Sequence, residues 1–170
     1  MNAETEISKA TAPSQIDQAH IWRSRLLDAF ASLESNVAKL LARSEKNLAS
    51  DAAPLGQKIE ALKQLKTNPP LTKNCPARLA KICAELAPFL NIRSDIVHAK
   101  LAVCVCDGVL HAKFCNTMNS DKPYPELRML TFEDFDTMNK EIRRLSNQLN
   151  SIINPPSSPP QPKQGAAGGP

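Results

Sequence analysis

The chain has 170 residues and a formal net charge of +4, and 42% of its residues are hydrophobic. This length is typical of one folding unit with a substantial core, so we expect a single domain. No apolar run approaches the length needed to cross a bilayer, and the first residues lack the basic start and apolar centre of a secretory signal. The composition therefore argues against a membrane or secreted protein and predicts a cytoplasmic one.

Proline and glycine gather outside the periodic segments, above all at the end of the chain. The stretch "NPPSSPPQPKQGAAGGP" holds too little apolar surface to offset the entropy lost on ordering. We therefore predict a flexible N-terminus (1–13), a folded domain (14–153) and a disordered Pro-rich tail (154–170). The tail has a composition that could dock in an aromatic groove on a protein partner, although an inert tail is the simpler interpretation.

Two helices are predicted in the first part of the chain. From Ile16 to Leu40, apolar residues recur at steps of three or four, which indicates a helix of about seven turns. Ser14 is suited to cap its N-terminus. The stretch "PLGQKIEALKQLK" predicts a shorter helix, with Pro54 at its first turn and an end before "TNPP".

Two more helices are predicted later in the chain. The third begins near Pro76, and Pro88 should kink or restart it, because proline lacks an N–H donor and clashes with the preceding turn. The fourth follows Thr131, which together with Asp134 has the spacing of a capping box.

Between these last two helices, "LAVCVCDGVLHAKF" predicts a β-hairpin. Apolar residues alternate about Asp107-Gly108, a pair that favours a tight two-residue turn. The face expected to lie on the helices consists of Leu101, Val103, Val105, Leu110, Ala112 and Phe114. The predicted fold class is all-α, an up-and-down four-helix bundle with a β-hairpin between the third and fourth helices.

The stretch "NIRSDIVHAKL" in the third helix holds the candidate catalytic residues Arg93, Ser94, Asp95 and His98. Arg93 and His98 are about 140° apart around a helix axis, but a guanidinium arm is long enough to reach a phosphate held near the imidazole. Histidine can move a proton near neutral pH, and arginine can offset the charge that develops when RNA is cleaved. Asp95 could orient the ring, and Ser94 lies on the same helix face as His98.

A purely structural interpretation of these residues is open as well. In it, Arg93 forms an ion pair with Asp95 or Glu85 at the edge of the core, and His98 is merely hydrogen-bonded.

An arginine, a polar residue, three further residues and a histidine on the third helix of such a bundle resemble the HEPN domain superfamily. The resemblance covers roughly residues 14–153, through helix order and the motif Arg93-Ser94-Asp95-Ile96-Val97-His98. It implies a metal-independent endoribonuclease in which Arg93 binds phosphate and His98 is the general acid/base. Attack by the 2′-hydroxyl would leave a cyclic phosphate and a 5′-hydroxyl. Ser94 stands where the family more often has Asn, Asp or His.

The resemblance also implies RNA as the partner, a homodimer whose two motifs line one cleft, and no cofactor. Members of the family include toxins and defence effectors, and others are noncatalytic dimerisation or interaction modules. The noncatalytic module is the main alternative here.

A weaker alternative is a zinc-binding regulator. The outer face of the hairpin would carry Cys104, Cys106, His111 and Cys115, which are possible zinc ligands in an unusual spacing.

A diffuse basic block could attract an anionic polymer, although a solvated face is the simpler interpretation. It consists of Lys58, Lys63, Lys66, Lys73, Arg78 and Lys81, with Glu60 as its only acid. Because aromatic residues are few, any nucleic acid should bind mainly through backbone charge, with an affinity that falls steeply with salt.

Overall fold

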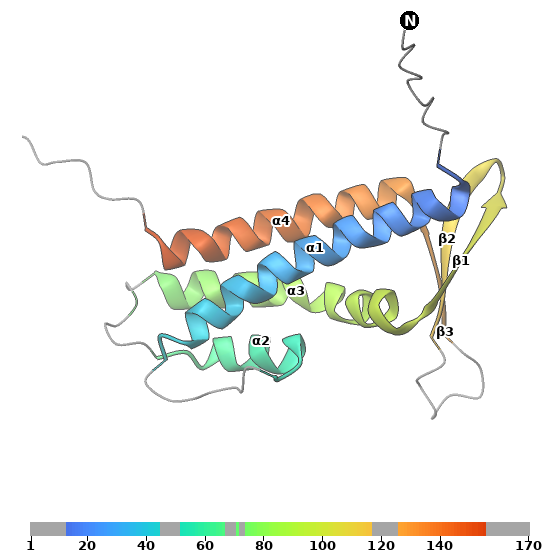
Figure 1. The fold of residues 1–170 in the computed structure, drawn as a ribbon. Helices are drawn as coiled ribbons and strands as arrows, with labels where there is room; N and C mark the ends of the chain where they lie inside the picture. Colours follow the sequence, from blue (N-terminus) through green and yellow to red (C-terminus); the bar gives the residue numbers. More distant parts are fainter. Residues whose placement is uncertain (1–12, 45–51, 67–70, 72–73, 117–125, 156–170) are drawn as a thin grey trace, which may run out of the picture.

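The computed structural model describes residues 13–44, 52–66, 71, 74–116 and 126–155. The predicted flexible N-terminus and Pro-rich tail lie almost wholly outside these residues. Within them the chain forms four helices and three strands (Figure 1). In chain order the elements are α1 (Gln15–Leu41), α2 (Leu55–Lys63), α3 (Cys75–His98), β1 (Lys100–Cys106), β2 (Val109–Asn116), β3 (Glu126–Thr131) and α4 (Phe132–Ile153).

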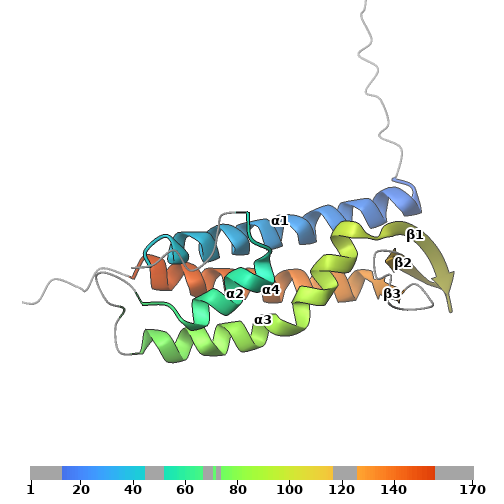
Figure 2. The ribbon, with the colours of Figure 1, turned by 90° about the horizontal axis from the view of Figure 1, so that it is seen from below.

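The two long helices α1 and α4 lie side by side and run in the same direction (Figures 1 and 2). Asn36 donates from Nδ2 to the carbonyl oxygen of Ser146 at 3.1 Å. Two residues past the end of α1, Arg43 donates from Nη1 to the carbonyl oxygen of Ile153, at the end of α4, at 2.9 Å. Residue numbers rise together in these contacts, so the helices are parallel.

Helix α3 runs against the other helices. The Cys83 thiol donates to the carbonyl oxygen of Ile59 in α2 at 3.8 Å, while Gly56 lies near Leu90, so the two helices are antiparallel. Pro88 lies inside α3, and Figure 2 shows the helix changing direction in its second half. The predicted kink is confirmed, and the helix continues through it without a restart.

The three strands form one antiparallel sheet in the order β1-β2-β3. Asp107 and Gly108 join β1 to β2 with φ angles of 51° and 76°. Both angles are left-handed, as a type I′ turn requires, and aspartate and glycine tolerate this region better than most residues. The predicted hairpin is confirmed.

The inner face of the sheet packs on the helices. Ala112 and Phe114 of β2 and Leu130 of β3 are buried there. Of the predicted inner face, Leu101 and Val103 are half-buried against the core, but Val105 near the turn is 54% exposed. The sheet stands at one end of the helical layer (Figure 1), which explains why its inner face is covered only in part.

The prediction of an all-α, up-and-down four-helix bundle is wrong. The fold is a mixed arrangement of helices and a three-stranded sheet, and α1 and α4 are parallel where an up-and-down bundle would have them antiparallel. The sequence interpretation missed β3 because its inner face carries Arg128 beside Leu130, while Leu127 and Met129 point outward and are exposed. Its alternation therefore does not separate apolar from polar residues.

Both predicted caps are present. At α1 the Ser14 hydroxyl accepts the backbone N–H of Asp17 at 3.3 Å. At α4 the Thr131 hydroxyl accepts the backbone N–H of Asp134 at 3.1 Å, and the Asp134 carboxylate accepts the backbone N–H of Thr131 at 2.8 Å. Each box satisfies two N–H groups that a helix start leaves without a partner.

We predict that Thr131→Ala lowers the free energy of unfolding by about 1 kcal/mol, because it removes the side-chain cap where β3 passes into α4. Urea denaturation followed by circular dichroism measures this change. Thr137→Ala, at an exposed position inside α4, is the control and should change stability by less than about 0.5 kcal/mol. Equal losses in the two variants would contradict the capping role.

Candidate functional site

Arg93 lies at a junction of three helices. Its Nη2 donates to Glu34 Oε2 of α1 at 3.0 Å, and its side chain is 28% exposed. The other oxygen of Glu34, Oε1, lies 3.9 Å from Nζ of the buried Lys58 in α2. The Glu34 carboxylate is thus shared by two cations, and this attraction stabilises the junction. The negative charge of Glu34 also lowers the positive potential around Arg93, so Arg93 attracts an anion less strongly.

Asp95 is buried on the side of α3 that faces the sheet. Its Oδ2 accepts a hydrogen bond from Nε of Arg128 in β3 at 2.8 Å. The sequence suggests that Asp95 orients His98, whereas this contact connects Asp95 to the sheet. Since a buried carboxylate is costly without a cationic partner, the pair fastens β3 to the end of α3.

His98 is the last residue of α3, and it is exposed. The carbonyl oxygen of the preceding Val97 accepts a hydrogen bond from Nη2 of Arg23 in α1 at 3.0 Å. Lys100, also exposed, begins β1 two residues later. The Arg23 guanidinium therefore lies where the partial negative charge of a helix C-terminus favours positive groups.

The structure brings the four predicted site residues onto one helix segment but gives them different surroundings. Arg93 and Asp95 are held by other elements, whereas Ser94 and His98 are exposed. In the structural alternative, Arg93 would pair with Asp95 or Glu85. Its partner is Glu34, and Glu85 pairs with Lys81 and Arg144.

Three residues of the site were missed by the sequence interpretation: Arg23, Glu34 and Arg128. Arg23 and Glu34 are eleven positions apart on α1, which is close to three full turns, so they lie on one helix face. That spacing was a usable signal for a polar edge facing α3. Arg128 gave no such signal, because its strand was not recognised.

The hairpin cysteines do not form a metal centre in the described part of the chain. Cys104 lies opposite His111, and its sulfur is 3.9 Å from that of Cys106. No three metal-binding side chains among the described residues are placed to hold an ion. Loss of solvent around the Cys104 thiol raises its pKa, as does its hydrogen bond with Cys106, so the thiolate form that binds zinc is disfavoured.

The basic block is dispersed over the helices. Lys58 is buried beside Glu34, Lys63 pairs with Glu60 at 2.6 Å, and Arg78 donates to the Ser151 hydroxyl at 2.9 Å. Lys73 lies outside the described residues. These partners favour the simpler interpretation, a set of solvated and paired cations on the helices.

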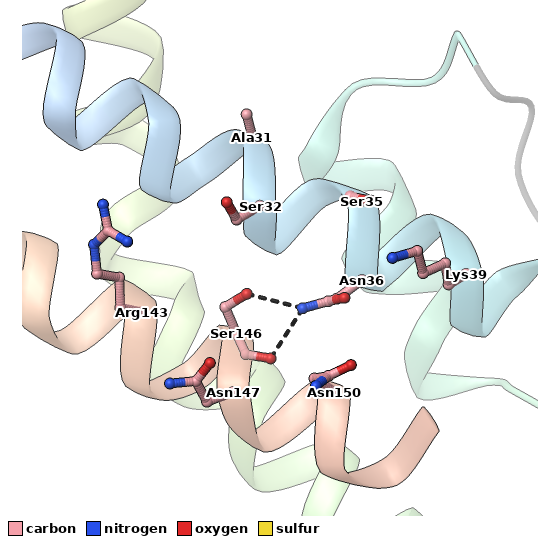
Figure 3. Close-up of a pocket in the computed structure, with 9 residues that line it drawn as sticks. All are labelled: Ala31, Ser32, Ser35, Asn36, Lys39, Arg143, Ser146, Asn147 and Asn150. Atoms are coloured by element: carbon pink, nitrogen blue, oxygen red, sulfur yellow. Dashed lines mark hydrogen bonds between the residues drawn. The ribbon is translucent and has the colours of Figure 1, made fainter. Parts of the chain in front are cut away.

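A polar groove of about 630 Å³ lies between α1 and α4 (Figure 3). Asn36 projects into it and donates to both the carbonyl oxygen and the hydroxyl of Ser146. Glu34, two residues earlier, points about 200° away around α1, toward α3. The groove is therefore separate from Arg93. Its lining comprises Ala31, Ser32, Ser35, Asn36, Lys39, Arg143, Ser146, Asn147 and Asn150.

Comparisons with protein-family models, curated proteins and solved structures return no match to this chain. Within the described residues, no helix combines the length and apolar character that a membrane span needs.

We predict measurable coupling between Asp95 and Arg128. In a double-mutant cycle of Asp95→Asn and Arg128→Gln, the coupling energy should be about 1 to 2 kcal/mol, below the value for breaking a fully buried pair because the Arg128 side chain is 34% exposed. Urea denaturation of the four proteins gives this energy.

The exposed pair Glu60 and Lys63 serves as the control cycle, made with Glu60→Gln and Lys63→Gln. Its coupling should be about 0.5 kcal/mol or less, because solvent screens the two charges. Coupling no larger for Asp95 and Arg128 than for this surface pair would show that β3 is held by other contacts.

Proposed function

We propose that the chain is a HEPN-like, RNA-directed protein whose Arg93 and His98 act together on a phosphodiester, as a metal-independent endoribonuclease that works as a homodimer. The observation that supports this most is the exposed imidazole of His98 at the end of α3. Lys100 follows two residues later, and Arg23 binds the carbonyl oxygen of the preceding Val97. An exposed histidine flanked by cations is suited to meet an RNA backbone.

In the proposed reaction, His98 takes the proton of a 2′-hydroxyl as that oxygen attacks the neighbouring phosphorus. The bond from phosphorus to the 5′ oxygen breaks, and the imidazolium of a second copy protonates the leaving oxygen. The products are a cyclic phosphate and a 5′-hydroxyl end. Arg93 offsets the charge that accumulates on the phosphoryl oxygens.

Arg93 can take this role while it is held by Glu34. A guanidinium carries five N–H donors, and the Glu34 contact is made from Nη2. Glu34 then restricts the rotamers of Arg93, so less side-chain entropy is lost when a phosphate binds. The cost is weaker attraction for the anion. Ser94, exposed on the face of His98, would contact the RNA strand, and Asp95 would position the helix end.

We predict that His98→Ala lowers RNA cleavage by about a hundredfold or more, since general acid–base groups contribute on that scale. Assorted RNAs are incubated with chelator, and the product end groups are identified. Arg93→Ala should also be strongly impaired.

His20→Ala is the matched control, because His20 is an exposed histidine on α1. It should cleave as the wild type does. Undiminished cleavage by His98→Ala would remove the catalytic proposal.

A second candidate function is a noncatalytic HEPN-like interaction module. The observation that favours it is the Arg93–Glu34–Lys58 cluster, which gives Arg93 a structural reason to be present. In this case Arg93 stabilises the junction of α1, α2 and α3 and has no part in RNA chemistry.

We predict that Glu34→Gln separates the two candidates. The amide keeps a hydrogen-bond acceptor for Arg93 but removes the negative charge, so RNA should bind about three- to tenfold more tightly if Arg93 contacts phosphate. Fluorescence anisotropy with labelled RNA at several salt concentrations measures this. Unchanged RNA binding together with lower thermal stability would favour the noncatalytic module.

A further inference from the structure

Two aromatic side chains, a half-buried tryptophan and an exposed phenylalanine, form a ridge at the sheet end of the molecule. Trp22 of α1 and Phe132 of α4 have ring centroids 5.3 Å apart, and Phe132 is 48% exposed. Hollows lie on both sides of the ridge. The larger, of about 660 Å³, reaches across to the hairpin turn, and the smaller, of about 40 Å³, lies toward Phe135 and Asp136.

The larger hollow favours an apolar occupant with a positive charge. Its lining includes Trp22, Phe132 and Val109, together with the carboxylates of Asp107 and Glu133. It contains no lysine or arginine, and its other titratable side chains are His111 and Cys106. An occupant carrying acidic groups would meet like charges here.

The chain itself contains a segment with this chemistry. In "PSSPPQPK", residues 156 to 163, prolines stand at every third position and a lysine follows the last of them. A polyproline helix has three residues per turn, so Pro156, Pro159 and Pro162 would share one edge. Such edges dock in aromatic-lined grooves at a small entropic cost, and no acid occurs from residue 154 to the end.

The length of chain excludes docking on the same molecule. Phe132 and Ile153 are the two ends of α4, about 32 Å apart along the helix. The lining of the two hollows on α4 reaches no further than Asn139, about 21 Å from Ile153 along the helix. Pro156 is three residues past Ile153 and can lie at most about 11 Å from it, even when fully extended. The edge of three prolines therefore cannot lie as a whole in its own groove, and a second copy of the chain supplies the groove.

We propose that the Pro-rich segment 156–163 of one copy docks on the Trp22–Phe132 groove of a second copy. The prolines pack against the ridge and its two hollows, and Lys163 lies near Glu133 and Asp107. This interface is independent of the proposed RNA chemistry.

The test uses the full-length protein and its only tryptophan, Trp22. Sedimentation velocity should show association that rises with concentration, and Trp22 emission should shift over the same range. Two variants should each weaken association at least fivefold: one replaces Pro156, Pro159 and Pro162 with alanine, and the other is Phe132→Ser. Thermal unfolding checks that both remain folded.

A mixture of the two variants tests directly whether the segment of one copy binds the groove of another. One has an intact groove and the other an intact segment, so the mixture should associate more strongly than either variant does alone. A synthetic peptide of residues 154–164 should shift Trp22 emission in the alanine variant, and the same peptide with alanines for prolines should not.

Three results would overturn the proposal. The first is a wild type that stays monomeric with constant Trp22 emission. The second is an alanine variant that associates as the wild type does. The third is loss of association in Phe132→Ser alone, which would mean that the groove binds another surface of the second copy.

Discussion

The ion pair between Asp95 and Arg128 is the contact on which the position of the motif depends. Asp95 lies one turn before His98, and β3, which carries Arg128, passes directly into α4 at Thr131. The pair therefore connects the end of α3 to the start of α4 through a single strand. Burial of the Asp95 carboxylate costs free energy that a cationic partner offsets, and this explains why an arginine stands on the inner face of β3, where an apolar residue would otherwise be expected.

The sheet lies at one end of the helices, between the end of α3 and the start of α4. Helix α3 runs toward the sheet, three antiparallel strands follow, and the chain leaves along α4, away from the sheet. Helix α4 is thus antiparallel to α3 and parallel to α1, as the Asn36 and Arg43 contacts require. Helix α2 is also antiparallel to α3, so the departure from an up-and-down bundle lies in α1 and α2, which run in the same direction. The missed third strand is a separate error.

The features that depend on residues close together in the sequence were predicted correctly. Helix periodicity, the Ser14 and Thr131 caps, the bend at Pro88 and the Asp107-Gly108 turn depend on neighbours within a few residues, and all are present. Ion-pair partners depend on the fold. Arg93 was assigned to carboxylates near it in sequence, yet its partner Glu34 lies 59 residues away, and Arg128 is 33 residues from Asp95. Without the helix directions, no pattern could select these partners.

Packing explains some residues of the motif better than others. Arg93 closes a junction of three helices, and Asp95 holds the sheet, so each has a structural reason for its place. His98 is exposed at the helix end, where alanine or lysine would serve the fold as well. The Arg93 guanidinium is fixed by Glu34, which suits a cation that positions a phosphate. The His98 imidazole is open to solvent, which suits a group that transfers protons. The case for RNA cleavage therefore depends on His98, and the interior contacts of Arg93 determine how strongly it can assist.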